Sequence, residues 1–147
     1  MFSISITSNA TEALQKQLQR LSAIDVSDLA AMQASTLLAV MRDRIHVQGL
    51  NASGTPIGIY SPAYLKRRQK HGRGANPQVV LSYTRQLEKS YVIVPMGDTC
   101  GIGVSTAENR HKVKWLEDMY GKVFSPTKEE NELMHQIAQD FIKKKLK

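Results

Sequence analysis

Apolar residues near the start of the chain follow first a strand period and then a helical period. Phe2–Thr7 alternate apolar and polar side chains, which predicts a half-buried strand. Residues 9–22 then place Leu14, Leu18 and Leu21 at positions i, i+4 and i+7. This spacing puts the three leucines on one face and predicts an amphipathic helix.

A second helix is expected over residues 27–47, because its apolar residues cover a wide arc of the helical surface. Asp25 or Ser27 can cap its first turn. Gly49 is a suitable C-terminal stop, since glycine adopts the left-handed conformation that often ends a helix. A helix with such a broad apolar surface should pack into the core.

A long loop is expected over residues 49–78, which begin with a stretch rich in glycine. Within it, Ser61-Pro62 resembles an N-cap followed by proline at the first helical position, so we expect a short helix at 62–70. The remaining predicted elements are a strand at 79–83, a hairpin of strands 89–94 and 99–105, a helix at 107–120 and a final helix that begins at Ser125-Pro126.

These elements predict an α+β fold: a small, mostly antiparallel sheet packed with N-terminal and C-terminal helices. A length of 147 residues fits a single domain over residues 1–147. Any boundary would have to fall within 49–78, and neither half alone has a convincing core.

Composition excludes several classes of protein. Apolar residues make up 41% and charged residues 22%, which is typical of a globular domain. No apolar run is long enough to span a bilayer, and the N-terminal residues do not resemble a signal peptide, so no membrane partner is expected. The single cysteine, Cys100, permits neither an intrachain disulfide nor a cysteine-based metal site.

The sequence contains no recognisable catalytic or cofactor-binding set. The four histidines are scattered without metal-site spacing, and we expect them to be ordinary surface or edge residues. Cys100 lies in a strand pattern and is expected to be a small buried apolar residue. Gly101-Ile102-Gly103 lacks the rest of a dinucleotide fingerprint. We therefore expect no enzyme activity, no cofactor and no metal; a small hydrolase or nuclease that uses His and Glu has no positive feature behind it.

Most of the net charge of +7 lies in one short segment. The bases there are Lys66, Arg67, Arg68, Lys70 and Arg73, and residues 64–74 contain no acid. Such a segment can contact phosphates or an acidic partner, or it can be a solvated loop. The two alternatives stay open, with the solvated loop slightly favoured because no aromatic residue is interleaved among the bases.

Aromatic residues supply a set of candidate interface positions. The only tryptophan, Trp115, lies off the main apolar face of its helix, so it is either a partly buried core residue or an anchor for a neighbouring subunit. The other candidate interface residues are Tyr120, Phe124, Tyr60 and Tyr64.

Three blocks of sequence resemble a known family. The first is Arg42-Asp43-Arg44-Ile45, a glycine-containing loop and Ser61-Pro62-Ala63-Tyr64-Leu65-Lys66-Arg67-Arg68. The second is Val80 to Ser90, similar to a strand followed by Thr-Gly-x-Leu-x-x-Ser, with Arg85 where the family usually has glycine. The last is Val123-Phe124-Ser125-Pro126-Thr127 before the final helix. In this order the blocks resemble the bacteriophage virion-morphogenesis or tail-completion proteins, over roughly residues 42–147.

The resemblance implies a structural, non-enzymatic protein of the head–tail junction. Such a protein forms a homo-oligomeric ring on the connector or adaptor and meets the tail terminator or tail tube, with the basic segment facing packaged DNA or an acidic neighbour. Its location would be the virion, after assembly in the cytoplasm of the bacterial host. The alternative that the residues themselves suggest is a small basic nucleic-acid-binding protein.

Overall fold

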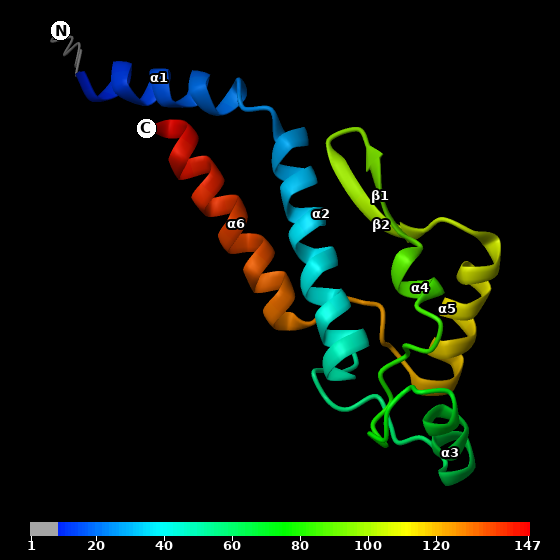
Figure 1. Cartoon of the computed structure of the whole chain (residues 1–147). Helices are drawn as coiled ribbons and strands as arrows, with labels where there is room; N and C mark the ends of the chain where they lie inside the picture. The colour runs from blue at the N-terminus through cyan, green and yellow to red at the C-terminus, as the bar shows by residue number, and fades with distance from the viewer. Residues whose placement is uncertain (1–8) are drawn as a thin grey trace, which may run out of the picture.

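The computed structural model describes residues 9–147 and is built around one central helix. This helix is α2 (Val26–Arg42), and a π-helical segment, η1 (Asp43–Gln48), continues it without a break. In Figure 1 the strands lie on one side of α2 and the C-terminal helix lies on the other. The expected helix at 27–47 is confirmed, but its last turns are π-helical rather than α-helical.

Local chemistry fixes both ends of this central helix. Asp25 caps the first turn, because its side chain accepts a hydrogen bond from the Ser27 N–H at 2.9 Å. Gly49 ends the helix with a φ of 68°, in the left-handed region that glycine tolerates best. A Cβ at Gly49 would lie 2.4 Å from the carbonyl oxygen of Val79, so this position has no room for another residue.

The other helices are α1 (Asn9–Ser22), α3 (Pro62–Lys70), the short α4 (Gln86–Lys89), α5 (Ala107–Tyr120) and α6 (Lys128–Leu146). Three sequence predictions match α1, α3 and α5. The expected start of the final helix at Ser125-Pro126 is wrong, because Thr127 is the N-cap. Thr127 and Glu130 form a reciprocal capping box, which satisfies more of the first-turn N–H groups than a serine two residues earlier could.

The sheet is a single antiparallel hairpin of β1 (Tyr91–Met96) and β2 (Thr99–Val104), as expected for residues 89–105. Ile93 lies opposite Ile102 in its register. The α+β prediction with a small sheet is therefore confirmed. The strand expected at Phe2–Thr7 lies outside the described residues.

The strand expected at 79–83 is wrong. Val79 is completely buried and its N–H donates to the Gly58 carbonyl at 2.9 Å, but ladder pairing stops at an isolated bridge between Gln78 and Ile59. Leu81, with a φ of 45°, turns the chain out of the extended conformation. The apolar run here reflects burial of an irregular segment and not a strand.

The core gathers around the C-terminal end of the central helix. Its buried members are Met41, Ile45, Ile57, Val79 and Val123. Met41 and Ile45 come from the central helix, Ile57 from the expected loop, Val79 from the irregular segment after it and Val123 from the segment before α6. One cluster thus unites residues from 41 to 123. α1 joins the central helix at its opposite end, away from this core (Figure 1).

Among the described residues, no single helix is long and apolar enough to cross a membrane. α1 and the central helix meet the length and composition criteria only as a pair, and the two are bent by 61° at their junction.

Candidate interaction surfaces

The polar group with the most partners in the interior is Arg44, which joins η1 to the start of α6. Its Nε lies 2.7 Å from Oε1 of Glu130, and both side chains are buried. The two terminal guanidinium nitrogens donate to three backbone carbonyls, those of Leu50, Val123 and Ser125. All three nitrogens of the guanidinium donate to an acceptor inside the protein. Arg44 is therefore a structural joint and not a free reactive group.

Sequence reasoning missed this joint. The Thr127-x-x-Glu130 spacing is a capping-box signal that could have placed the N-cap of α6. The ion pair itself has no local signal, because 86 residues separate its members.

A cage of tyrosines surrounds Arg68, one of the five candidate nucleic-acid contacts. Its guanidinium carbon lies 4.6 Å from the ring centre of Tyr60, 5.7 Å from that of Tyr83 and 6.0 Å from that of Tyr64. Nη2 donates to the Ser82 carbonyl at 2.9 Å, and the residue is only 4% exposed. Arg68 therefore anchors α3 to the body of the protein and cannot meet a phosphate.

The other four bases, Lys66, Arg67, Lys70 and Arg73, are exposed on α3 and the turn after it. Arg73 also lies over Tyr83, with its guanidinium carbon 5.4 Å from the ring centre. The fold thus presents a basic surface whose backbone is held in place by the caged arginine. The sequence places no aromatic residue among these bases, but in the folded protein Tyr60, Tyr64 and Tyr83 lie beside the basic segment.

Trp115 is 60% exposed on α5, and Met119, one turn further on, is exposed beside it. The interpretation of Trp115 as a core residue is wrong, because the inward positions of this helix belong to other side chains. The structure does not bring Trp115 together with the other candidate aromatics. Tyr60, Tyr120 and Phe124 pack against the core, and Tyr64 is partly exposed above Tyr60.

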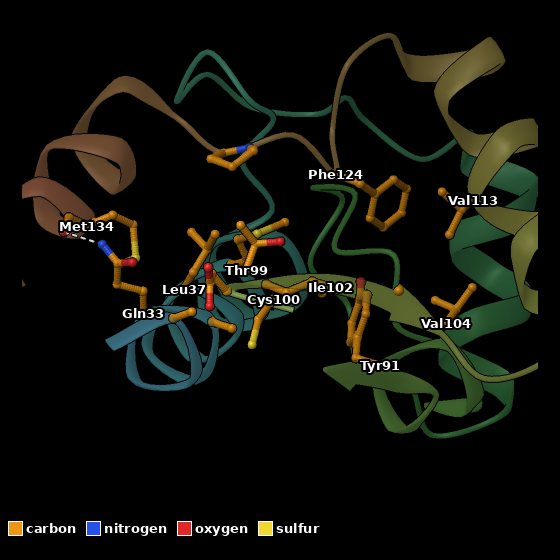
Figure 2. Close-up of a pocket in the computed structure, with 16 residues that line it drawn as sticks. Gln33, Leu37, Tyr91, Thr99, Cys100, Ile102, Val104, Val113, Phe124 and Met134 are labelled. Carbon is orange, nitrogen blue, oxygen red and sulfur yellow. Dashed lines mark hydrogen bonds between the residues drawn. The ribbon is translucent and has the colours of Figure 1, made fainter. Parts of the chain in front are cut away.

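An apolar groove with a volume of about 570 Å³ runs between the central helix, the hairpin, α5 and α6 (Figure 2). Leu37, Ile102, Val113 and Phe124 are among the side chains that face it. At one end, Gln33 Nε2 donates to the Met134 carbonyl at 2.8 Å and ties α2 to α6. Cys100 lines the groove and is partly exposed, so it is not the fully buried residue that its strand pattern suggested.

α1 has its apolar face in solvent. Every side chain described in this helix, from Glu12 to Ser22, is exposed. Leu14 is 57% exposed, Leu18 55% and Leu21 39%. Its contact with the rest of the chain lies near the end of α6, where Arg20 Nη1 donates to the Leu146 carbonyl at 3.3 Å.

His46 is buried, contrary to the expectation that all four histidines lie at the surface. Its Nε2 is 2.9 Å from the Tyr91 hydroxyl, and its Nδ1 is 3.8 Å from a Glu88 carboxylate oxygen. Burial lowers the pKa of His46, an effect that Glu88 opposes and Arg42 reinforces. Burial therefore favours the neutral form of the ring over an ion pair with Glu88. Burial also raises the pKa of Tyr91.

Within residues 9–147, no group of three or more His, Cys, Asp or Glu side chains is placed to hold a metal ion. Most of the buried polar residues instead cap helices, pair with one another or hold the backbone. No family model, no curated protein and no solved structure matches this chain.

Proposed function

We propose that this chain is a structural, non-enzymatic subunit of a bacteriophage head–tail junction. As a neck or tail-completion protein, it assembles into a ring on the connector and joins that ring to the tail. The observation that carries the proposal is the presence of two unlike apolar surfaces at different places on one chain, the leucine face of α1 and the groove beside the hairpin.

Two unlike surfaces suit a ring. Subunits in a ring contact head to tail, so each one offers a different face to each of its two neighbours. An isologous dimer needs only one such face. Soluble monomers rarely leave large apolar patches uncovered, and an amphipathic helix whose apolar face is in solvent is a patch of this kind.

The local geometry of Thr84–Ser90 supports the family resemblance. Arg85 has a φ of 62°, the left-handed conformation that favours the glycine usual at this position in the family. Leu87 and Ser90, at the two family-like positions that follow, are buried. The Ser90 carbonyl accepts a hydrogen bond from the Ser105 N–H at 2.8 Å and so fixes the entry to the hairpin.

The first and last family-like blocks also meet in space. Arg44, in the first block, donates to the carbonyl of Val123, in the last, and Val123 is completely buried. Ile45 is a buried neighbour of Val123 in the same core cluster. The first and last blocks thus contribute to one core. A family that keeps these blocks in this order would need to preserve that core.

Electron microscopy and multi-angle light scattering over a concentration series test the ring. We expect closed rings, alone or after addition of a phage connector. Fluorescence of Trp115, the only tryptophan, should shift to shorter wavelength if assembly covers it. A strict monomer under both conditions, with unchanged emission, would remove the proposal.

The exposed bases of α3 favour a second candidate, a small nucleic-acid-binding protein. Lys66, Arg67, Lys70 and Arg73 share one surface segment, and in a ring the same residues could face packaged DNA. Binding of duplex DNA would then weaken with salt by a log–log slope of about −0.9 for each phosphate contacted. Substituting all four by glutamine should abolish it, whereas binding that ignores salt would reject this candidate.

A further inference from the structure

We infer that the α1 arm, residues 9–22, docks into the apolar groove of a second copy of this chain. The inference deepens the ring proposal and rests on it, since it names the two surfaces that meet at each subunit boundary. Neither surface was assigned a partner by the sequence.

The arm has the form of a helical ligand. Leu14, Leu18 and Leu21 lie at i, i+4 and i+7, the spacing by which an amphipathic helix fills a hydrophobic groove. Their exposure leaves the whole stripe available, because no described side chain of α1 is buried in its own subunit. Glu12, Lys16 and Gln19 lie on the opposite face of the helix.

The groove has the form of a matching receptor. Small residues, Ala30, Ala34 and Gly103, line it beside larger apolar side chains, which allows a helix to approach closely. Its only charged lining residue is Asp98, at the hairpin turn. The arm as a whole carries Lys16 and Arg20 against one acid, Glu12, so its net charge of +1 is opposite in sign to the charge of Asp98.

The arm cannot occupy its own groove in this conformation. A bend of 61° sends α1 outward from the central helix, whereas folding back along it would need a much larger turn. Figure 1 shows α1 passing over the end of α6 and away from the hairpin, and the Arg20 bond to Leu146 holds it there. The occupant that fits is therefore the arm of a neighbour.

The length of α1 sets how much of a neighbouring subunit it can contact. α1, with 14 residues, is about 21 Å long.

Cys100 makes a direct test simple, because it lines the groove and is the only cysteine. A chain with Leu18→Cys and Cys100→Ala is mixed with the unmodified full-length chain and oxidised with copper phenanthroline, which takes two electrons and two protons from the thiol pair. We expect a disulfide-linked heterodimer on a non-reducing gel. The matched control places the cysteine on the opposite face of the same helix, with Gln19→Cys and Cys100→Ala, and should link at least tenfold less.

A single chain that carries both Leu18→Cys and the natural Cys100 distinguishes head-to-tail assembly from a reciprocal exchange of arms between two subunits. Head-to-tail contacts should give a ladder of linked species, and a reciprocal exchange should stop at the dimer. Linkage confined to one chain, or linkage no greater than in the Gln19→Cys control, would overturn the inference. Circular dichroism verifies that each variant is folded.

Cross-linking and electron microscopy together distinguish failure of the arm contact from failure of the proposed function. Rings in the electron microscope without Leu18–Cys100 linkage would keep the junction function and discard the arm contact. Linked heterodimers and a ladder without closed rings would confirm the contact and discard the ring.

Discussion

The guanidinium of Arg44 and the carboxylate of Glu130 meet at 2.7 Å inside the protein, although 86 residues separate them in the chain. Glu130 uses its other oxygen to accept the Thr127 N–H at 2.8 Å, so one carboxylate both caps α6 and neutralises η1. The C-terminal helix is thereby fixed to the central helix at its first turn.

Removing one member of this pair should be costly. Arg44→Met leaves the Glu130 carboxylate buried without its counter-charge, and we expect the free energy of unfolding to fall by about 3–5 kcal/mol. Urea denaturation followed by circular dichroism measures it. The double variant with Glu130→Met should lose less than the sum of the two single losses, because the second change removes the stranded charge. Additive losses would show that the pair does not act as a unit.

Arg85 should be a site where glycine stabilises the protein. Its φ of 62° is strained for any residue with a Cβ, and relief of that strain should raise the free energy of unfolding by about 1 kcal/mol in Arg85→Gly. Arg85→Ala is the matched control, because it removes the side chain and keeps the strain. Equal stability of the alanine and glycine variants would mean that the backbone here is unstrained.

Stability should fall on mild acidification because of His46. Its folded pKa lies below the unfolded value of about 6.5, so the unfolded state takes up a proton first as the pH decreases. The contribution is complete above about pH 6.5 and is lost as the pH falls from there toward the lowered folded pKa. Melting temperatures between pH 7.5 and 5 should show this slope. His46→Gln should flatten it, whereas His111→Gln, at an exposed position, should not.

Of the five bases of residues 66–73, only one should contribute strongly to the free energy of unfolding, and the other four should behave as surface residues. Arg68→Lys loses the planar group that lies over the tyrosines, and we expect a loss of about 1–2 kcal/mol in the free energy of unfolding. Lys66→Gln or Lys70→Gln should change it by less than about 0.5 kcal/mol. A chemical denaturation series on the three variants decides this, and similar losses in all of them would contradict the tyrosine cage.

Much of the local structure could be predicted from the sequence. Ser61-Pro62, Gly49 and the β-branched run before Gly97 each act within a few residues, so the ends of α3 and η1 and the position of the hairpin follow from neighbouring side chains. Position 79 shows the limit, since an apolar run predicts burial equally well for a strand and for an irregular segment.

The interaction surfaces were harder to foresee. In the tyrosine cage, Tyr60 precedes Arg68 in the chain and Tyr83 follows it. The groove combines side chains from the central helix, the hairpin, α5 and α6. The leucine period of residues 9–22 correctly predicted a helix, but periodicity cannot tell whether an apolar face meets its own core or is left in solvent. That distinction depends on where a three-residue linker points the helix.

The joint at Arg44 also governs when the subunit can take shape. Its guanidinium binds the carbonyls of Val123 and Ser125 and the carboxylate of Glu130, so its full set of partners exists only once the ribosome has passed residue 130. Before that point the first half of the chain lacks the groups that compensate this charge when it is buried. A nascent chain that stalls before that residue therefore cannot complete the joint.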